Sequence, residues 1–503
     1  MPCRPSPPPS SRSRRSASHA LARLSSETTE RRGHEQGALV TGAMPGAAML
    51  TSIDVRLRPG RARRLRWRCE VARDTAAAGK PRRSERHHAS RASIRGKGYF
   101  RRLGPGIVTG AADDDPSGIG TYSQVGAATG NRLLWSAPVL LPLAFAVQEA
   151  CARLALVTGK GLAGIIRERL PRPMLFLCVA LVAVANTVNI AADIGSMSAA
   201  LRLLVPVPPL AGVVGFGAVI VLAEIYVPYH RYAKLLRWLC LSLLAYVAVL
   251  FVAKVNWPQV GLDIVIPKIV WGRPDVALLI GLAGTTISPY LFFWQSAEEM
   301  EARATEEGYA VNETHIRAMR GDVFAGMATG VFVMMAIMIT ASATLHRAGI
   351  TTVQTAEQAA QALSPLAGPF AGVLFLLGIV GTGLLSVPVL AGATSYAIAE
   401  TFGWRESLEK RPSQARAFYA VILVSVVVGL GLNLIGLDPI QFLFIAAVTN
   451  GLAAPVLMAV IWWLARDTRL LGEWRSPLWS RILLGVATIA MGVLPFLWLL
   501  APA

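Results

Sequence analysis

The chain has few of the residue types on which soluble enzymes and metal-binding proteins depend. Of its 503 residues, 5 are cysteine, 7 are histidine and only 16% are charged, whereas 53% are hydrophobic. The cysteines are scattered and form no C-x-x-C pair, so the sequence indicates neither a disulfide framework nor a zinc site. Four histidines lie in the first 88 residues and no nucleophile motif is present, so we expect neither enzymatic activity nor a bound cofactor. Apolar sequence is abundant instead, which excludes an ordinary soluble domain.

Basic charge is concentrated at the beginning of the chain. Residues 1–103 hold 24 of the 49 Lys and Arg residues but only 7 of the 30 acidic residues. A segment this rich in Arg, Ser and Pro cannot bury a core, so we expect residues 1–97 to be a disordered tail. No aromatic interleaving accompanies the charge, so we expect no nucleic-acid partner. Two alternatives stay open: contact with an anionic lipid leaflet, or sequence upstream of a true start at Met44 or Met49.

Residues 98–503 have the hydropathy of an all-α, polytopic membrane protein in contact with a lipid bilayer. We predict eleven spans, because apolar runs of membrane-crossing length alternate with short polar loops. The loops on one side of the predicted spans hold 18 Lys and Arg residues, and those on the other side hold 6. Because basic loops stay in the cytoplasm, this predicts a cytoplasmic amino terminus and an external carboxyl terminus. We expect a monomer in a bacterial-type plasma membrane. The predicted spans are residues 104–128, 133–157, 173–200, 207–226, 232–254, 276–296, 321–344, 366–400, 417–437, 438–464 and 482–501.

The first predicted span contains a run of three carboxylates, Asp113, Asp114 and Asp115, followed by Pro116. Each carboxylate at membrane depth costs roughly 3 kcal/mol on insertion scales, so lipid cannot accommodate all three. Pro116 removes a backbone donor, and Ser117, Gly118 and Gly120 weaken the helix further. We therefore predict two half-helices around an unwound stretch whose polar groups face the protein interior.

The sixth predicted span repeats this pattern. Its sequence GLAGTTISPYLFFWQS places Thr285, Thr286 and Ser288 directly before Pro289. Two interrupted spans, five helices apart, indicate two structural repeats. Transporters built from inverted repeats bind their substrate where such helices break.

These stretches resemble the Nramp family of divalent-metal transporters. The resemblance is carried by GPGIVTGAADDDPSG, ARLALVTGKGLA and GTTISPY, and hydropathy extends it over most of residues 98–503. It implies the LeuT fold, with repeats at about residues 104–254 and 276–464 and an extra helix at about 482–501. Family members carry Asp-Pro-Gly-Asn in the first helix and Met-Pro-His in the sixth, where this chain has DPSG (residues 115–118) and SPY (288–290).

The resemblance also implies the ligands of the transported ion. Carried over, they are the Asp115 carboxylate and the backbone carbonyls of Ala112 and Thr285, while Gly118 and Ser288 occupy the positions of the family's Asn and Met. Ser288 in place of a thioether removes a soft ligand. Gly118 is expected to enlarge the site, and a roomy, oxygen-only site suits Mg²⁺, which keeps several of its waters. The two motifs resemble those of the Nramp-related magnesium transporters, so we expect Mg²⁺ and also Mn²⁺ as substrates.

Proton coupling is not expected. The proton-coupled branch carries two acids in its third helix, and alignment on Ile194-Gly195 puts Asn189 and Ala192 at those positions, with Asp193 one residue away. The sixth-helix His is Tyr290, which does not titrate near neutral pH. Asp113, Asp114, Asn189, Asp193, Tyr290 and Asn450 are candidates for the second coordination shell or the ion pathway.

Two other functions are alternatives. One is a proton-coupled manganese or iron importer of the same family. The other is an amino-acid or organic-solute symporter, which shares interrupted first and sixth helices. Three consecutive carboxylates would repel a substrate carboxylate, which disfavours the symporter.

Overall fold

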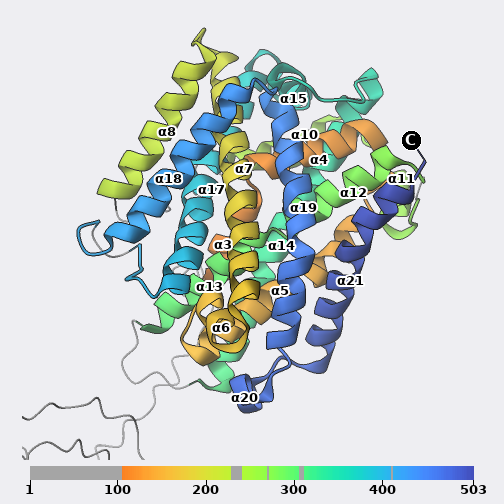
Figure 1. The fold of residues 1–503 in the computed structure, drawn as a ribbon. Helices are drawn as coiled ribbons and strands as arrows, with labels where there is room; N and C mark the ends of the chain where they lie inside the picture. Colours follow the sequence, from red (N-terminus) through yellow and green to blue (C-terminus); the bar gives the residue numbers. More distant parts are fainter. Residues whose placement is uncertain (1–104, 228–240, 269–270, 305–310, 409–411, 503) are drawn as a thin grey trace, which may run out of the picture. The chain divides into compact units, whose positions relative to one another are not determined.

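The computed structural model describes residues 105–227, 241–268, 271–304, 311–408 and 412–502. The predicted basic tail, residues 1–97, lies outside the described residues. All regular structure in the described ranges is helical (Figure 1). This agrees with the predicted all-α membrane architecture.

Nine of the described helices are long and apolar enough to cross a membrane. They match nine of the eleven predicted spans, with ends that differ by up to eight residues. Helices α13 and α14 show the largest differences, because the last turns of α13 before Ala304 and the first turns of α14 at Glu313 are polar and lie outside the apolar runs. The spans are α5 (Ser136–Thr158), α7 (Arg172–Arg202), α8 (Pro209–Tyr226), α12 with α13 (Arg273–Ala304), α14 (Glu313–Thr344), α17 (Ala371–Phe402), α18 (Arg416–Leu432), α19 (Pro439–Leu464) and α21 (Leu478–Leu500).

The first and fifth predicted spans are not single long helices in the described residues. The first is divided into α3 (Pro105–Asp113) and α4 (Pro116–Thr129), each too short to cross a membrane alone. The fifth is described only from residue 241, where a short 3-10 turn leads into α10 (Leu244–Val252). Short helices that hydropathy did not predict occupy the connections: α6 (Leu162–Arg169), α11 (Trp257–Val265), α15 (Ala356–Gln361), α16 (Ser364–Ala367) and α20 (Thr468–Leu471).

Glycine allows the interrupted helices to pack closely against their neighbours. A Cβ atom at Gly110 of α3 would lie 2.3 Å from the carbonyl oxygen of Gly326 in α14. A Cβ at Gly284 of α12 would lie 2.2 Å from the carbonyl oxygen of Ala447 in α19. Small residues at helix interfaces permit this backbone approach in membranes. The close packing keeps the polar stretches of both interrupted helices away from lipid.

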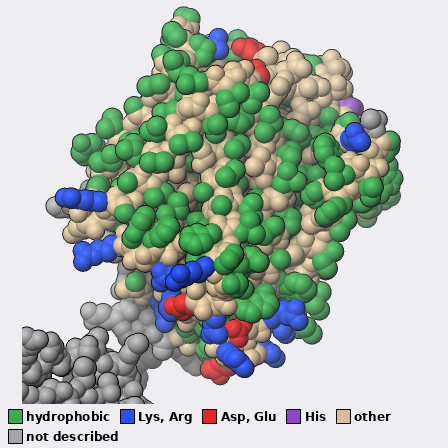
Figure 2. All heavy atoms as spheres, in the orientation of Figure 1, with side chains coloured by type: hydrophobic (Ala, Val, Ile, Leu, Met, Phe, Trp, Pro, Cys, Tyr) green, Lys and Arg blue, Asp and Glu red, His purple; other side chains and the backbone are tan. Residues whose placement is uncertain are grey.

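Basic side chains from several of the loops between helices lie together at one end of residues 105–502. Arg169 of α6 lies 3.2 Å from Asp467, which caps α20, and Arg303 of α13 donates to the carbonyls of Leu156 and Val157 in α5. Figure 2 shows Lys and Arg side chains around this end and hydrophobic side chains over the flanks. The described loops that carry Arg169, Arg303 and Asp467, all predicted to be cytoplasmic, therefore contact one another or the same helix end, as a common inner face requires.

Candidate functional site

Two helix interruptions meet in the protein interior. Helix α3 ends at Asp113 and α4 begins at Pro116, while α12 ends at Thr286 and α13 begins at Pro289. Each second half-helix begins with a proline. The missing N–H of proline costs nothing at this position, where an N–H has no partner within the helix, and its fixed φ suits a helix start. The ends of α3 and α12 direct carbonyl oxygens, and the partial negative charge of a helix C-terminus, into the gap.

Asp115 is the best-connected residue of the first interruption. It is 1% exposed and caps α4: its Oδ1 accepts from the backbone N–H of Gly118 at 2.7 Å and from the Ser117 hydroxyl at 2.8 Å. Its Oδ2 accepts from the Asn189 amide of α7 at 2.7 Å. Three donors thus fix this carboxylate in the interior without a paired cation. A carboxylate held in this way keeps lone pairs for a metal ion.

Both carbonyls expected to bind the ion accept hydroxyl hydrogen bonds. The Tyr290 hydroxyl of α13 donates to the Ala112 carbonyl at 2.8 Å and so joins the two interrupted helices. The Ser288 hydroxyl donates to the carbonyls of Thr285 at 2.8 Å and Gly284 at 3.0 Å. A carbonyl oxygen has a second lone pair, so these bonds orient the carbonyls and still allow them to bind a cation.

Helix α7 brings two further predicted residues to the interruption. Asn189 holds Asp115, and the Asn450 amide of α19 lies 3.5 Å from the Asn189 carbonyl oxygen, so three elements are linked in a row. Asp193, one turn further along α7, accepts from the Ser386 hydroxyl of α17 at 2.8 Å. Ser386 was not among the predicted residues. Its position two residues before Pro388, inside an apolar helix, repeats the Ser-Pro association of the sixth span and could have drawn attention to it.

Asp113 and Asp114 are also buried and directly precede Asp115 in the chain. Asp113 faces α14, where a Cβ at Gly330 would lie 3.4 Å from its Oδ2. Asp114 is 3% exposed, and one oxygen of each of these two carboxylates has no hydrogen-bond partner. Among the described residues, no three His, Cys, Asp or Glu side chains converge as a metal cluster. Any ion at this site would therefore depend on few carboxylates and on neutral oxygens.

Two features of the site differ from the sequence reasoning. Gly118 does not leave open space, because a Cβ there would lie 3.2 Å from the Tyr122 ring and 3.4 Å from Asp115 Oδ1. Sulfur is also nearer than expected: the Thr286 hydroxyl lies 3.4 Å from the thioether sulfur of Met334 in α14. Neither neighbour could be found from the sequence, because both come from other turns or other helices.

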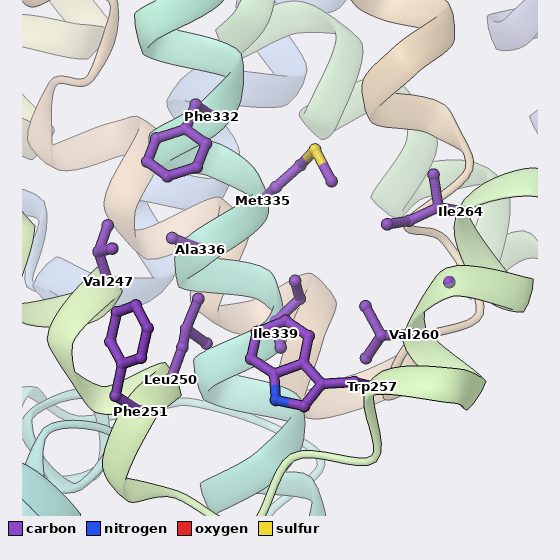
Figure 3. Close-up of a pocket in the computed structure, with 11 residues that line it drawn as sticks. Val247, Leu250, Phe251, Trp257, Val260, Ile264, Phe332, Met335, Ala336 and Ile339 are labelled. Carbon is purple, nitrogen blue, oxygen red and sulfur yellow. The ribbon is translucent and has the colours of Figure 1, made fainter.

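A separate groove between α10, α11 and α14 has a different character. Figure 3 shows it lined by aliphatic and aromatic side chains, among them Leu250, Trp257 and Met335. It offers no carboxylate or converging carbonyls, so its chemistry is that of a lipid-facing surface rather than an ion site.

Sequence comparison identifies the family. The sequence pattern of natural resistance-associated macrophage protein-like (Nramp) proteins matches residues 106–501. The chain belongs to the Nramp family. This is a family of membrane transporters rather than enzymes.

Curated relatives of this Nramp chain include bacterial proteins named divalent metal cation transporter MntH. The protein from Aeromonas hydrophila is 30% identical over 381 residues, which cover 74% of this chain and 89% of the relative. The protein from Klebsiella pneumoniae strain 342 is 29% identical and covers 76% of this chain and 89% of the relative.

Solved structures show the same fold. The manganese transporter of Eremococcus coleocola superposes with a TM-score of 0.64 at 19% identity, covering 79% of this chain and 87% of that one. MhsT in complex with L-phenylalanine superposes with a TM-score of 0.56 at 14% identity, covering 79% and 98%. The Nramp chain therefore has a LeuT-like helical fold.

Proposed function

We propose that this Nramp protein carries divalent metal cations across the membrane, with Mg²⁺ as its preferred substrate and Mn²⁺ as a second one. The observation that supports this best is the pair of buried interruptions, linked by the Tyr290 hydroxyl on the Ala112 carbonyl, with Asp115 in one and Thr285 in the other. One carboxylate with neutral oxygens is the donor set of a hard cation that keeps part of its water. The names of the MntH relatives support divalent metal as the substrate class.

Ser288 supports magnesium over softer ions. It is 1% exposed, and its hydroxyl is bonded to the carbonyls at the end of α12. This hard oxygen ligand stands where a soft thioether would favour transition metals. Because Gly118 adds no free volume, the proposal depends on donor type and not on the size of the site.

A second candidate is a proton-coupled manganese importer. It is favoured by the Met334 thioether beside Thr286, which provides sulfur one helix turn from the interruption. Against proton coupling, the side chain that donates to Asp115 from α7 is the Asn189 amide, and the one that donates to the Ala112 carbonyl from α13 is the Tyr290 hydroxyl. Neither side chain exchanges a proton near neutral pH.

Uptake into proteoliposomes that contain a pH-sensitive dye tests the proposal. Both Mg²⁺ and Mn²⁺ should enter without acidifying the lumen. Lumen acidification that accompanies Mn²⁺ but not Mg²⁺ would establish the importer instead, and uptake of neither ion would reject divalent transport.

Ser288→Met tests the role of the hard ligand. An added soft ligand worth about 1.4 kcal/mol would raise the Mn²⁺-to-Mg²⁺ ratio of kcat/KM about tenfold. Ser288→Leu is the matched control, since it has similar bulk and loses the same hydroxyl but adds no sulfur. An equal change in both variants would mean that the hydroxyl bonds, and not ligand softness, set the preference.

A further inference from the structure

Asp193 lies where three elements meet, next to the ion site proposed above. It belongs to α7, is 0% exposed, and receives the Ser386 hydroxyl of α17 on Oδ2 at 2.8 Å. Helix α17 also reaches the first interruption directly, because a Cβ at Gly383 would lie 3.3 Å from the Pro116 ring. Asp193 follows Asn189, the residue that donates to Asp115, by one turn of α7.

One oxygen of Asp193 is unused. Its Oδ1 is buried and has no hydrogen-bond partner, although a buried carboxylate oxygen normally accepts at least one bond. One oxygen each of Asp113 and Asp114 is also unpaired, but Asp193 has its other oxygen fixed by a hydroxyl from a neighbouring helix. The unpaired oxygen of Asp193 indicates a role that a cation completes.

The charge of a divalent ion favours a second carboxylate at the proposed site. A divalent ion beside a single carboxylate keeps one uncompensated positive charge in a medium of low dielectric constant, which is costly. Mg²⁺ is usually bound through one or two carboxylates with waters filling the other positions. In this chain, Asn189 next to Asp115 is neutral, so a second negative charge would come from another buried acid, Asp113, Asp114 or Asp193. Among these, Asp193 has one oxygen fixed by the Ser386 hydroxyl of a further helix.

We propose that Asp193 is the second carboxylate of the ion site, so that Asp115 and Asp193 together neutralise one divalent cation that retains part of its water. The Ser386 hydroxyl fixes Oδ2 of Asp193 and leaves Oδ1 to face the ion or one of its waters. This inference depends on the proposed divalent transport and adds a specificity-determining residue to it. Ions of higher charge should gain most from Asp193.

Asp193→Asn in the full chain, reconstituted in proteoliposomes, tests the inference. The amide keeps the shape and can still accept the Ser386 hydroxyl, but it removes the charge. We expect the KM for Mg²⁺ and for Mn²⁺ to rise at least tenfold, with the rate at saturating ion changed less than threefold. A merely structural role would lower the amount of active protein, and hence the maximal rate, without moving KM.

Asp263→Asn is the matched control. Asp263 is also a buried carboxylate, 4% exposed in α11, and it pairs with Lys268 rather than with a residue of either interruption. Its variant should keep both KM values. If Asp193→Asn does not fold, Asp193→Ser replaces it. Ion binding is then measured as the Mn²⁺-induced rise in Tm of the detergent-solubilised protein.

The outcomes separate the two proposals. Unchanged KM values in Asp193→Asn, together with wild-type uptake of Mg²⁺ or Mn²⁺, would overturn the role of Asp193 and leave divalent transport standing. Absence of uptake by the wild-type protein would instead overturn the proposed function itself.

Discussion

Asp115 combines a structural and a proposed ion-binding role in one side chain. Its Oδ1 caps α4 through the Gly118 N–H, and the same carboxylate is the proposed charged ligand of the ion. Replacing it with alanine removes both the proposed ion ligand and the helix cap. Loss of an N-cap costs about 1 kcal/mol. Asparagine separates them, since it caps a helix as well as aspartate but carries no charge.

We expect Asp115→Ala and Asp115→Asn both to abolish cation uptake. Asp115→Asn should keep the Tm of the wild-type protein, whereas Asp115→Ala should lower it by the lost cap. Asp113→Asn and Asp114→Asn are the controls and should have smaller effects on uptake, because neither side chain contacts Asp115 or the Asn189 amide. Uptake by Asp115→Asn at the wild-type rate would show that the ion binds elsewhere.

The outcome at Ser288 and Tyr290 shows how far residue-scale prediction reaches. The motif placed both residues at the second interruption, which the structure contains. The Ser288 bond to Thr285 is local, but the Tyr290 bond to Ala112 joins two chain segments 178 residues apart. No local pattern encodes such a distance.

Helix α6 shows how the connections are fixed to the long helices. Its first turn lies against Glu400 of α17, whose Oε2 accepts from the Gly164 N–H at 2.7 Å. Arg167 in the last turn of α6 donates to the Glu400 carbonyl. Gly161, the N-cap of α6, leaves the room that Glu400 occupies: a Cβ there would lie 1.6 Å from Glu400 Oε1.

Gly161→Ala should therefore destabilise the protein. The added methyl group forces Glu400 from its place, and overpacking of this kind costs about 1–3 kcal/mol. Gly164→Ala is the control, since its Cβ would keep an ordinary 3.6 Å contact with Glu400. Thermal unfolding in detergent should show a lower Tm for Gly161→Ala and an unchanged or higher Tm for Gly164→Ala.

Combining Gly161→Ala with Glu400→Ala in one protein tests whether these two residues clash directly. If Gly161 and Glu400 interact as described, the double variant should be more stable than the sum of the two single effects predicts. Strict additivity would contradict a direct clash.

For the whole molecule, the described helices divide into an inner and an outer group. The interrupted span α12–α13 is largely buried, whereas α8, α18 and α21 leave most of their surface exposed and carry large apolar side chains there. A bilayer covers such a surface, and no water-soluble protein of this size would expose so much of it. The interior then holds the polar groups that lipid excludes.

A chain that begins at Ser93 should insert and transport normally. The match to the Nramp family starts at residue 106, and the composition of the preceding segment offers no apolar face to bury. Uptake of Mg²⁺ and Mn²⁺ by this shortened chain, compared at equal protein content with the full chain, provides the measurement. Loss of folding or uptake would assign the segment a structural role.

The sequence by itself determined the class of the protein, most of its helices and the positions of both interruptions. These features depend on local properties: apolar length, the cost of carboxylates in lipid, and the missing N–H of Pro116 and Pro289. Helices such as α6 and α11 were missed because they are short, and tertiary contacts rather than hydropathy stabilise them.

Only the tertiary structure decided which groups meet at the interruptions. The contacts of Asp115 with Asn189, of Asp193 with Ser386 and of Thr286 with Met334 join helices whose relative rotation the sequence does not encode. A side chain's identity follows from the sequence, but its neighbours follow from the packing of all the helices together.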